Sequence, residues 1–416
     1  MKRIVPVVVV VTIAWAWMSP RFSTPLFGQG RGTPAPHIGE GGVPQFERDP
    51  AWPKVPEKWK MGFGSAITGD EQGHVWVLSR PRGLRYPRRT APDLTSTPAP
   101  PVMEFDQAGT FIQGWGGESG PGYQWPSNEH GLTIDSKGFV WIVGNADGKS
   151  NNPANLANDN QVLKFTRNGK FVMAIGKSGQ TGSNKTDVLK GATSVFYYAR
   201  ANELFVSDGY GNSRVIVFDA DTGKMKRMWG AYGNRPLDPE DRPKPSALRP
   251  IPWVTVSEAL QQFSTPHDVK ISNDGLVYVC DRGNKRVQVF TLDGTFIAEQ
   301  FMGLDKSAAL AAARGVAFSP DPEQKFMYVG GDPAVWILNR KTLEVLGSFA
   351  VGAPDQADPP GHQLGTDTKG NVYLVQAELT GADGKSGGTP AFKWVLKGYS
   401  PAARCCGSGS SQTSLK

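Results

Sequence analysis

Residues 266–297 read PHDVKISNDGLVYVCDRGNKRVQVFTLDGTFI, and this stretch decides the fold class. Four short runs of apolar or alternating residues are separated by turn formers, as in strands with a buried face. The pair Asp293-Gly294 between the last two runs is typical of a tight β-hairpin. The stretch therefore predicts one antiparallel sheet of four strands.

The same phrase recurs along the chain: a short apolar strand, Asp or Asn with Gly, and a run that ends in aromatic and aliphatic residues. Six copies open at or near Ala66, His130, Thr193, His267, Arg314 and His362. One such sheet cannot bury both of its faces alone, whereas a ring of sheets buries them against each other. We therefore predict an all-β protein, a six-bladed β-propeller of four-stranded antiparallel blades over residues 57–400. A seven-bladed ring with a degenerate blade in 235–263 is the alternative.

Composition agrees with many strands and turns. The 416 residues include 50 Gly and 33 Pro, which excludes a helical bundle, and only 305–313 favours a helix. The net charge of +7 comes without a nucleic-acid motif, so no nucleic-acid partner is expected. The three cysteines, at 280, 405 and 406, cannot build a disulfide framework, and we expect a monomer.

The N-terminus has the pattern of an export signal. Lys2 and Arg3 precede an apolar run over 4–17 that is short for a membrane span. We expect a signal peptide over 1–18, with an uncleaved anchor as the alternative, and a secreted or periplasmic protein with no stable membrane insertion after its removal. Residues 19–56 are expected to be a flexible Gly/Pro-rich lead-in, and 401–416 a polar tail.

Three of the five histidines open repeats two, four and six: His130, His267 and His362. Alternate blades of a six-fold ring lie about 120° apart, and the first strand of each blade lines the central channel. The three imidazoles should therefore converge on the axis, as in a catalytic zinc site with one open position. The alternative is that each histidine merely packs the channel wall. His74 is expected to be solvated in a polar turn.

A second repeated position lies just past the second strand of a blade. It carries Arg80, Tyr210 and Arg282. Beside a cation, two guanidinium groups and a phenol suit a carboxylate-bearing substrate and a proton transfer. The nearby polar residues are interpreted as structural pins of the turns: Asp208, Asn212, Arg214, Asp281, Asn284 and Arg286.

These phrases resemble NHL-type repeats. FVSDGYGNSR at 205–214, His-Gly-Leu at 130–132 and Pro-His at 266–267 make the chain similar to the peptidyl-α-hydroxyglycine α-amidating lyases. The resemblance implies a Zn²⁺ held by the three channel histidines, Tyr210 as proton acceptor, and Arg80 and Arg282 on the substrate carboxylate. It implies a carbon–nitrogen lyase that cleaves a carbinolamide, a small carboxylate-bearing or peptide substrate, into an amide and glyoxylate.

The chain departs from that family at two positions. The family's structural Ca²⁺ uses an Asp just after the third histidine, where Gln363 stands here, and Gly211 replaces a paired Cys beside the tyrosine. A non-catalytic binding or scaffold propeller that kept the metal site is therefore the alternative function. A calcium-type lactonase would need acidic residues at the blade-opening positions, which this sequence does not have.

Overall fold

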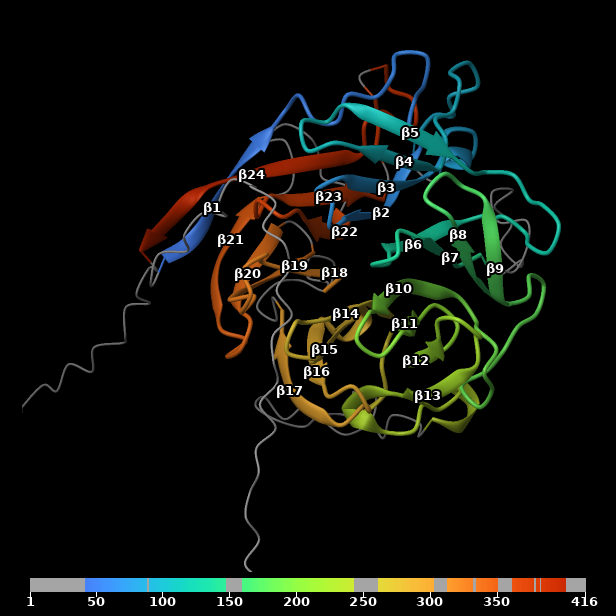
Figure 1. Cartoon of the computed structure of the whole chain (residues 1–416), viewed down its shortest axis with the longest axis vertical. Coiled ribbons are helices and arrows are strands. Elements are labelled where there is room, and N and C mark those ends of the chain that lie inside the picture. Colours follow the sequence, from blue (N-terminus) through green and yellow to red (C-terminus); the bar gives the residue numbers. More distant parts are fainter. Residues whose placement is uncertain are drawn as a thin grey trace, which may run out of the picture. The chain divides into compact units, whose positions relative to one another are not determined.

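The computed structural model describes residues 42–87, 90–146, 159–242, 261–302, 313–331, 334–350, 361–377, 379–381 and 383–401. In this part the chain forms six four-stranded sheets placed around a ring (Figure 1). The predicted six-bladed β-propeller is confirmed, and the seven-bladed alternative is wrong. The expected signal segment 1–18, nearly all of the expected helix 305–313 and the tail beyond 401 lie outside the described residues.

Each blade is a meander of antiparallel strands. Blade 1 contains β2 (Phe63–Gly69), β3 (Val75–Arg80), β4 (Val102–Phe105) and β5 (Phe111–Trp115). Blade 2 contains β6 (Glu129–Ile134), β7 (Val140–Gly144), β8 (Gln161–Phe165) and β9 (Phe171–Gly176). Blade 3 contains β10 (Ala192–Tyr198), β11 (Glu203–Asp208), β12 (Arg214–Asp219) and β13 (Met225–Trp229).

The second half of the ring repeats this order. Blade 4 contains β14 (Pro266–Ile271), β15 (Val277–Asp281), β16 (Arg286–Phe290) and β17 (Phe296–Phe301). Blade 5 contains β18 (Gly315–Phe318), β19 (Phe326–Gly330), β20 (Ala334–Asn339) and β21 (Val345–Ala350). Blade 6 contains β22 (Gly361–Thr366), β23 (Val372–Gln376), β24 (Ala391–Pro401) and β1 (Gly42–Asp49). The described helices are single 3₁₀ turns at Pro81–Leu84, Ala231–Gly233, Pro239–Asp241 and Arg282–Asn284.

The hydrophobic core lies between the blades. Six apolar clusters each join the facing sheets of two neighbouring blades, and contacts between innermost strands run around the whole ring from β2 to β22. The Asp that recurs in the turn after the first strand stabilises this packing locally. Asp70 accepts the indole N–H of buried Trp76 at 2.9 Å, and Asp135 accepts that of Trp141 at the same distance. The repeated phrase therefore encodes both the turn and the aromatic residue that the turn supports.

The ring is closed by strands from opposite ends of the described chain. β1 is the outermost strand of blade 6 and pairs antiparallel with β24, from Gly42 opposite Pro401 to Asp49 opposite Lys393. The expectation of a flexible lead-in over 19–56 is therefore wrong for residues 42–49. Phe46 of β1 packs on Phe349 with ring centroids 4.8 Å apart, which ties this strand to blade 5.

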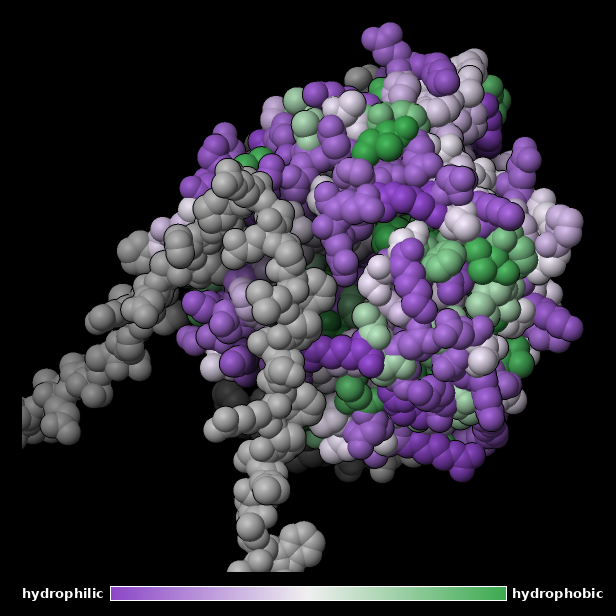
Figure 2. Space-filling view, viewed as in Figure 1, coloured by the Kyte–Doolittle hydropathy of each residue, from purple (hydrophilic) through white to green (hydrophobic). Residues whose placement is uncertain are grey.

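Among the described residues, no helix is long and apolar enough to cross a membrane. On the face shown in Figure 2, hydrophilic side chains cover most of the blades, and apolar side chains occur in small separate groups. This distribution agrees with apolar side chains that are buried between neighbouring blades.

Candidate metal centre

The structure brings the three repeat-opening histidines together at the centre of the ring. His130 lies on β6, His267 on β14 and His362 on β22, and all three are buried. Their ring centroids form a nearly equilateral triangle with sides of 4.6, 4.8 and 4.9 Å. Each ring offers a nitrogen within 4.8 Å of the nitrogens of the other two. Their separation fits three ligands of one metal ion.

A break in the strand pairing places His130 and His267. The register of β6 with β7 shifts between Glu129 and Gly131, and that of β14 with β15 shifts between Pro266 and Asp268. A β-bulge leaves one residue outside the ladder and redirects its side chain. The histidine is that extra residue in both strands, and β22 has a similar irregularity that spans His362.

One nitrogen of each imidazole is held by the next blade around the ring. Nδ1 of His130 lies 2.6 Å from the carbonyl oxygen of Thr193, that of His267 lies 2.5 Å from Arg314 O, and that of His362 lies 2.6 Å from Ser65 O. Because a carbonyl oxygen only accepts, Nδ1 must carry the proton. The neutral ring therefore keeps its lone pair on Nε2, as in metal-bound histidines whose other ring nitrogen donates to a backbone carbonyl.

The environment keeps the three rings neutral. Burial lowers the pKa of each imidazole well below its ordinary value, and the guanidinium of Arg80 lowers it further. Neighbouring imidazoles add to this effect for His130 and His362, and the guanidinium of Arg282 adds to it for His267. Among the described residues, Nε2 of His267 is buried without a hydrogen-bond partner. An unpaired buried acceptor is costly, and a metal ion would satisfy it.

Two of the predicted partners of the histidines lie at the edge of this triangle. The hydroxyl of Tyr210 is 3.3 Å from Nε2 of His130 and 3.2 Å from Nη1 of Arg282. Tyr210 follows β11 and Arg282 follows β15, so blades 3 and 4 supply the pair. Tyr210 is 45% exposed, so solvent reaches this side of the histidines.

Arg80 reaches the site from the end of β3. Its Nε donates to the backbone oxygen of Glu129 at 2.7 Å, immediately before His130. The side chain of Glu129 points into a buried place, where Oε1 accepts the indole N–H of Trp125 at 2.8 Å, and burial raises the pKa of this carboxyl to about 7. Arg80 is therefore anchored beside His130, and its positive charge lowers the pKa of all three histidines.

Sequence reasoning missed the role of the residues that open the blades between those of the histidines. In odd-numbered blades the blade-opening positions carry Ser65, Thr193 and Arg314, and each of these residues bonds to the next blade. Ser65 Oγ donates to Glu129 O at 2.7 Å, Thr193 Oγ1 to Pro266 O at 2.7 Å, and Arg314 Nη1 to Gly361 O at 3.4 Å. Together with the three imidazole bonds they form a closed ring of contacts. The repeats themselves could have indicated this role, because these three residues occupy the same position in their blades as the histidines do in theirs.

The groups beside the histidines do not fit a calcium ion. At the position that the resemblance assigns to a calcium ligand, the amide of Gln363 donates to Thr193 O at 3.1 Å, so it presents a donor there. The buried carboxylate of Asp268 is already shared by Ser194 Oγ at 2.6 Å and the backbone N–H of Val316 at 3.0 Å. Ca²⁺ requires six to eight oxygen ligands, and the described residues beside the histidines do not offer such a set.

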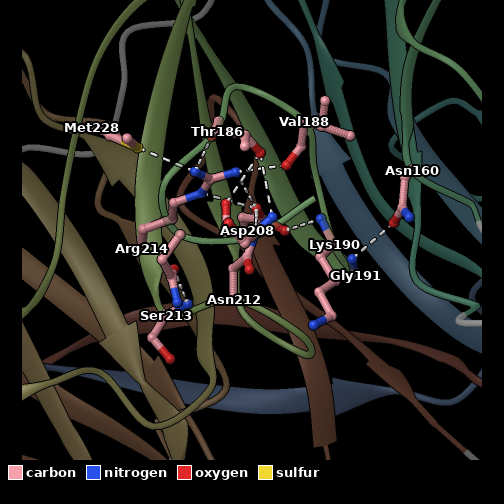
Figure 3. Close-up of polar contacts among 12 residues, drawn as sticks. Asn160, Thr186, Val188, Lys190, Gly191, Asp208, Asn212, Ser213, Arg214 and Met228 are labelled. Carbon is pink, nitrogen blue, oxygen red and sulfur yellow. Dashed lines mark hydrogen bonds and ion pairs between the residues drawn. The ribbon is translucent and has the colours of Figure 1, made fainter. Parts of the chain in front are cut away.

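The turn that carries Tyr210 is pinned as the sequence predicted (Figure 3). Buried Asp208 pairs with buried Arg214 at 3.0 Å and accepts the side-chain amide of Asn212 at 2.7 Å. Arg214 also donates to Val188 O at 2.8 Å, which ties the turn to the segment before blade 3. Blade 4 repeats this node: Asp281 accepts Asn284 at 2.7 Å and Arg286 at 2.9 Å. The structural interpretation of these six residues is therefore confirmed.

His74 differs from the expectation that it is solvated. Its Nδ1 is 2.6 Å from buried Glu104, and the guanidinium of Arg167 pairs with Glu104 and with Asp70. His74, Asp70 and Glu104 are close enough together to hold a metal ion, yet Arg167 already supplies the positive charge between them. This second group is an ion-pair network that joins blades 1 and 2.

Comparisons with known proteins agree with the repeat fold. The NHL repeat family model matches residues 263–290. The chain is 24% identical to mouse NHL repeat-containing protein 3 over 80% of this chain and 82% of that protein. It is 29% identical to mouse peptidyl-glycine alpha-amidating monooxygenase over 60% of this chain and 22% of that protein. It is also 29% identical to a probable peptidyl-alpha-hydroxyglycine alpha-amidating lyase of Caenorhabditis elegans, over 39% of this chain and 36% of that protein.

The chain thus spans about a fifth to a third of the length of these two amidating relatives. It is a six-bladed β-propeller with NHL-type repeats that is similar in sequence to the peptidyl-α-hydroxyglycine α-amidating lyases.

Proposed function

We propose that this protein is a zinc-dependent lyase that cleaves a carbinolamide of the α-hydroxyglycine type into an amide and glyoxylate. One observation carries the proposal. Three buried neutral histidines turn toward one another, and the hydroxyl of Tyr210 lies 3.3 Å from one of them and 3.2 Å from Arg282. Metal ligands, a proton acceptor and an anion-binding group are then within reach of one small substrate.

Three neutral imidazoles are the ligand set of catalytic zinc sites that keep one position open. A Zn²⁺ held by His130, His267 and His362 would supply a Lewis acid for a substrate oxygen. The donor set fits this ion better than Mg²⁺ or Ca²⁺, which prefer oxygen ligands.

The side chains of the chain account for the remaining chemistry. In the proposed reaction the substrate hydroxyl loses its proton, its C–O bond becomes the carbonyl of glyoxylate, the C–N bond breaks, and the amide nitrogen gains a proton. Tyr210 would accept the hydroxyl proton, because its hydroxyl lies at the edge of the histidine triangle, 3.3 Å from Nε2 of His130 and 3.2 Å from Nη1 of Arg282. Arg282 and Arg80 would hold the carboxylate of the substrate, which guanidinium groups bind through paired hydrogen bonds.

A non-catalytic binding propeller is the second candidate. It is favoured by the length of the match to NHL repeat-containing protein 3, which spans 82% of that protein. In this case the histidine site would bind a metal without turnover. Export of the chain, inferred from its first 18 residues, is a proposal that both candidates share.

The experiment that separates them uses the purified, zinc-loaded protein and an N-acyl-α-hydroxyglycine such as α-hydroxyhippurate. Glyoxylate release is measured for the wild type, for the metal-free protein and for His267→Ala. The lyase proposal expects release by the zinc-loaded wild type only. Zinc binding without glyoxylate release from N-acyl substrates of different sizes would favour the binding propeller.

A further inference from the structure

The channel is crossed by one side chain immediately beside the histidines. Gln363 lies on β22 of blade 6, next to His362, and is 3% exposed. Its Nε2 donates to the carbonyl oxygen of Thr193 on β10 of blade 3, at 3.1 Å. Blades 3 and 6 stand opposite each other in a ring of six, so this hydrogen bond spans the channel.

The accepting carbonyl has a second partner. Thr193 O also accepts the Nδ1–H of His130 at 2.6 Å. The carbonyl therefore links the imidazole of His130 to the residue that follows His362. Two of the three histidines are connected across the channel through one oxygen atom, in addition to their bonds to neighbouring blades.

Gln363 belongs to a second polar layer, one residue further along the innermost strands. In that layer Asp268 of blade 4 accepts Ser194 Oγ of blade 3 at 2.6 Å and Val316 N of blade 5 at 3.0 Å. Beyond it, at the other ends of these strands, lies a hollow of about 320 Å³ lined by Gly69, Ile134 and Thr366, among others. Along the strands, the layer therefore lies between the histidines and this hollow.

We propose that Gln363 is a positioning residue of the metal centre. It fixes the spacing between His130 and His362 across the channel through the carbonyl oxygen of Thr193. The identity of the metal rests on the proposed function, whereas the positioning of the imidazoles does not.

The expected effect follows from what is known of groups that hold metal-binding histidines in place. Replacing a hydrogen-bond partner behind a metal-bound histidine typically lowers metal affinity about 10–100-fold. Gln363→Met keeps the length of the side chain and removes the donor. Gln363→Asn keeps an amide but shortens it by one methylene, so that it no longer reaches Thr193 O. Both variants should bind zinc about 10-fold more weakly than the wild type, the low end of this range, because Gln363 contacts the carbonyl oxygen of Thr193 and not the imidazole itself.

A matched control is Gln288→Met. Gln288 is also fully buried and donates its amide, to Glu299 at 3.0 Å, but it lies on the third strand of blade 4, away from the channel. This variant should lose stability without a change in zinc affinity. Zinc affinity is measured by competition with a chelator, on variants whose circular dichroism matches that of the wild type.

A second measurement does not depend on zinc. In metal-free protein, ¹H–¹⁵N spectra of the imidazoles should show a protected Nδ1–H for His130, and this proton should exchange faster in both Gln363 variants than in Gln288→Met. Unchanged zinc affinity or unchanged imidazole exchange in Gln363→Met and Gln363→Asn would overturn the proposal. A wild type that binds no zinc contradicts the proposed function, and the imidazole spectra would then decide the role of Gln363 alone.

Discussion

At the scale of single residues, the candidate site depends on which nitrogen of each histidine is free. A backbone carbonyl holds Nδ1 in all three rings, so Nε2 is left for the centre of the channel. The sequence contains two further histidines, His37 and His74. His37 lies outside the described residues, and His74 is held by Glu104 and Arg167. Position in the repeat therefore separates the three potential ligands from the histidine that contacts Glu104 and Arg167.

The first prediction concerns metal content. His267→Ala should lower zinc affinity by at least about 100-fold. This is the upper end of the range for losing a group that only hydrogen-bonds to a ligand, and His267 is a proposed ligand itself. His74→Gln should bind zinc like the wild type, because His74 lies in the ion-pair network with Glu104. Elemental analysis and chelator competition on both variants provide the test. Equal zinc binding by the wild type and His267→Ala would remove the metal assignment.

The second prediction concerns the hydroxyl of Tyr210. Tyr210→Phe keeps the ring but removes the proposed proton acceptor, so kcat should fall about 10²-fold or more while zinc content is unchanged. Tyr197→Phe is the control, because its hydroxyl bonds to Asn202 at 3.0 Å in the turn that joins β10 and β11, at the other end of these strands. Glyoxylate release is compared in all three proteins. Equal rates in the wild type and Tyr210→Phe would show that Tyr210 is a packing residue.

At the scale of elements, turns place the side chains of the site. The N–H of Tyr210 donates to Gly191 O at 3.0 Å, and Gly191 has a φ of +80°. A Cβ on Gly191 would lie 2.9 Å from Cβ of Tyr210. A glycine is therefore required where this turn approaches the segment before blade 3.

The third prediction tests that approach. Gly191→Ala should destabilise the protein by about 1–2 kcal/mol through its left-handed φ and should also displace Tyr210, which lowers kcat. Gly138→Ala has nearly the same φ, +81°, but meets no atom within 4 Å. It should lose similar stability and keep full activity. Thermal unfolding and glyoxylate release measure the two effects separately, and an active Gly191→Ala would show that the turn tolerates the displacement.

The fourth prediction concerns an ion pair inside blade 3. Burial raises the pKa of Glu203, but hydrogen bonds from Arg227 and Lys226 outweigh it, so the pKa lies below its ordinary value of about 4.3. A depressed carboxyl pKa stabilises the fold above the unfolded-state value, and this contribution is lost as pH falls through the folded-state value. Glu203→Gln should therefore be less stable than the wild type at pH 7 by about 1–3 kcal/mol.

This difference in stability should stay constant down to about pH 5 and shrink below about pH 4. Urea unfolding of both proteins at several pH values provides the measurement. A difference that does not change between pH 7 and pH 3 would mean that the carboxylate pair contributes nothing to the pH dependence.

At the scale of the whole molecule, the ring is held closed by β1 and β24. Val43 of β1 is buried in the apolar cluster between blades 5 and 6, and Phe46 of the same strand packs against this cluster. Burying two such side chains contributes about 3–6 kcal/mol. Closure by β1 also covers the edge of β24 that would otherwise be open to pairing with another chain.

The fifth prediction follows from this closure. A chain that begins at Ala51 lacks β1. Its free energy of unfolding should be lower by about 3–6 kcal/mol, so it should unfold at a lower temperature. It should also aggregate more readily, because the edge of β24 is uncovered. A chain that begins at Gly42 keeps β1 and is the control. Calorimetry and light scattering compare the two. Equal stability of both chains would show that β1 does not hold the ring together.

The sequence by itself determined the blades and the candidates for the site. Turn residues and alternating runs act over a few residues, so the repeated phrase was enough to predict six four-stranded blades. The strict alternation of His130, His267 and His362 then predicted their convergence, because equal repeats around a closed ring place equal positions at equal angles. The turn pins of Asp208 and Asp281 could be predicted for the same local reason.

Only the tertiary structure decided what depends on closure of the ring. β1 pairs with β24 from the opposite end of the described chain, and no local pattern marks such a partner. The carbonyl behind each imidazole belongs to another blade, and Gln363 meets Thr193 across the channel although they are 170 residues apart. Contacts of this kind are set by the number of blades and the width of the channel. A side-chain pattern within one blade carries no information about which backbone oxygen lies opposite it.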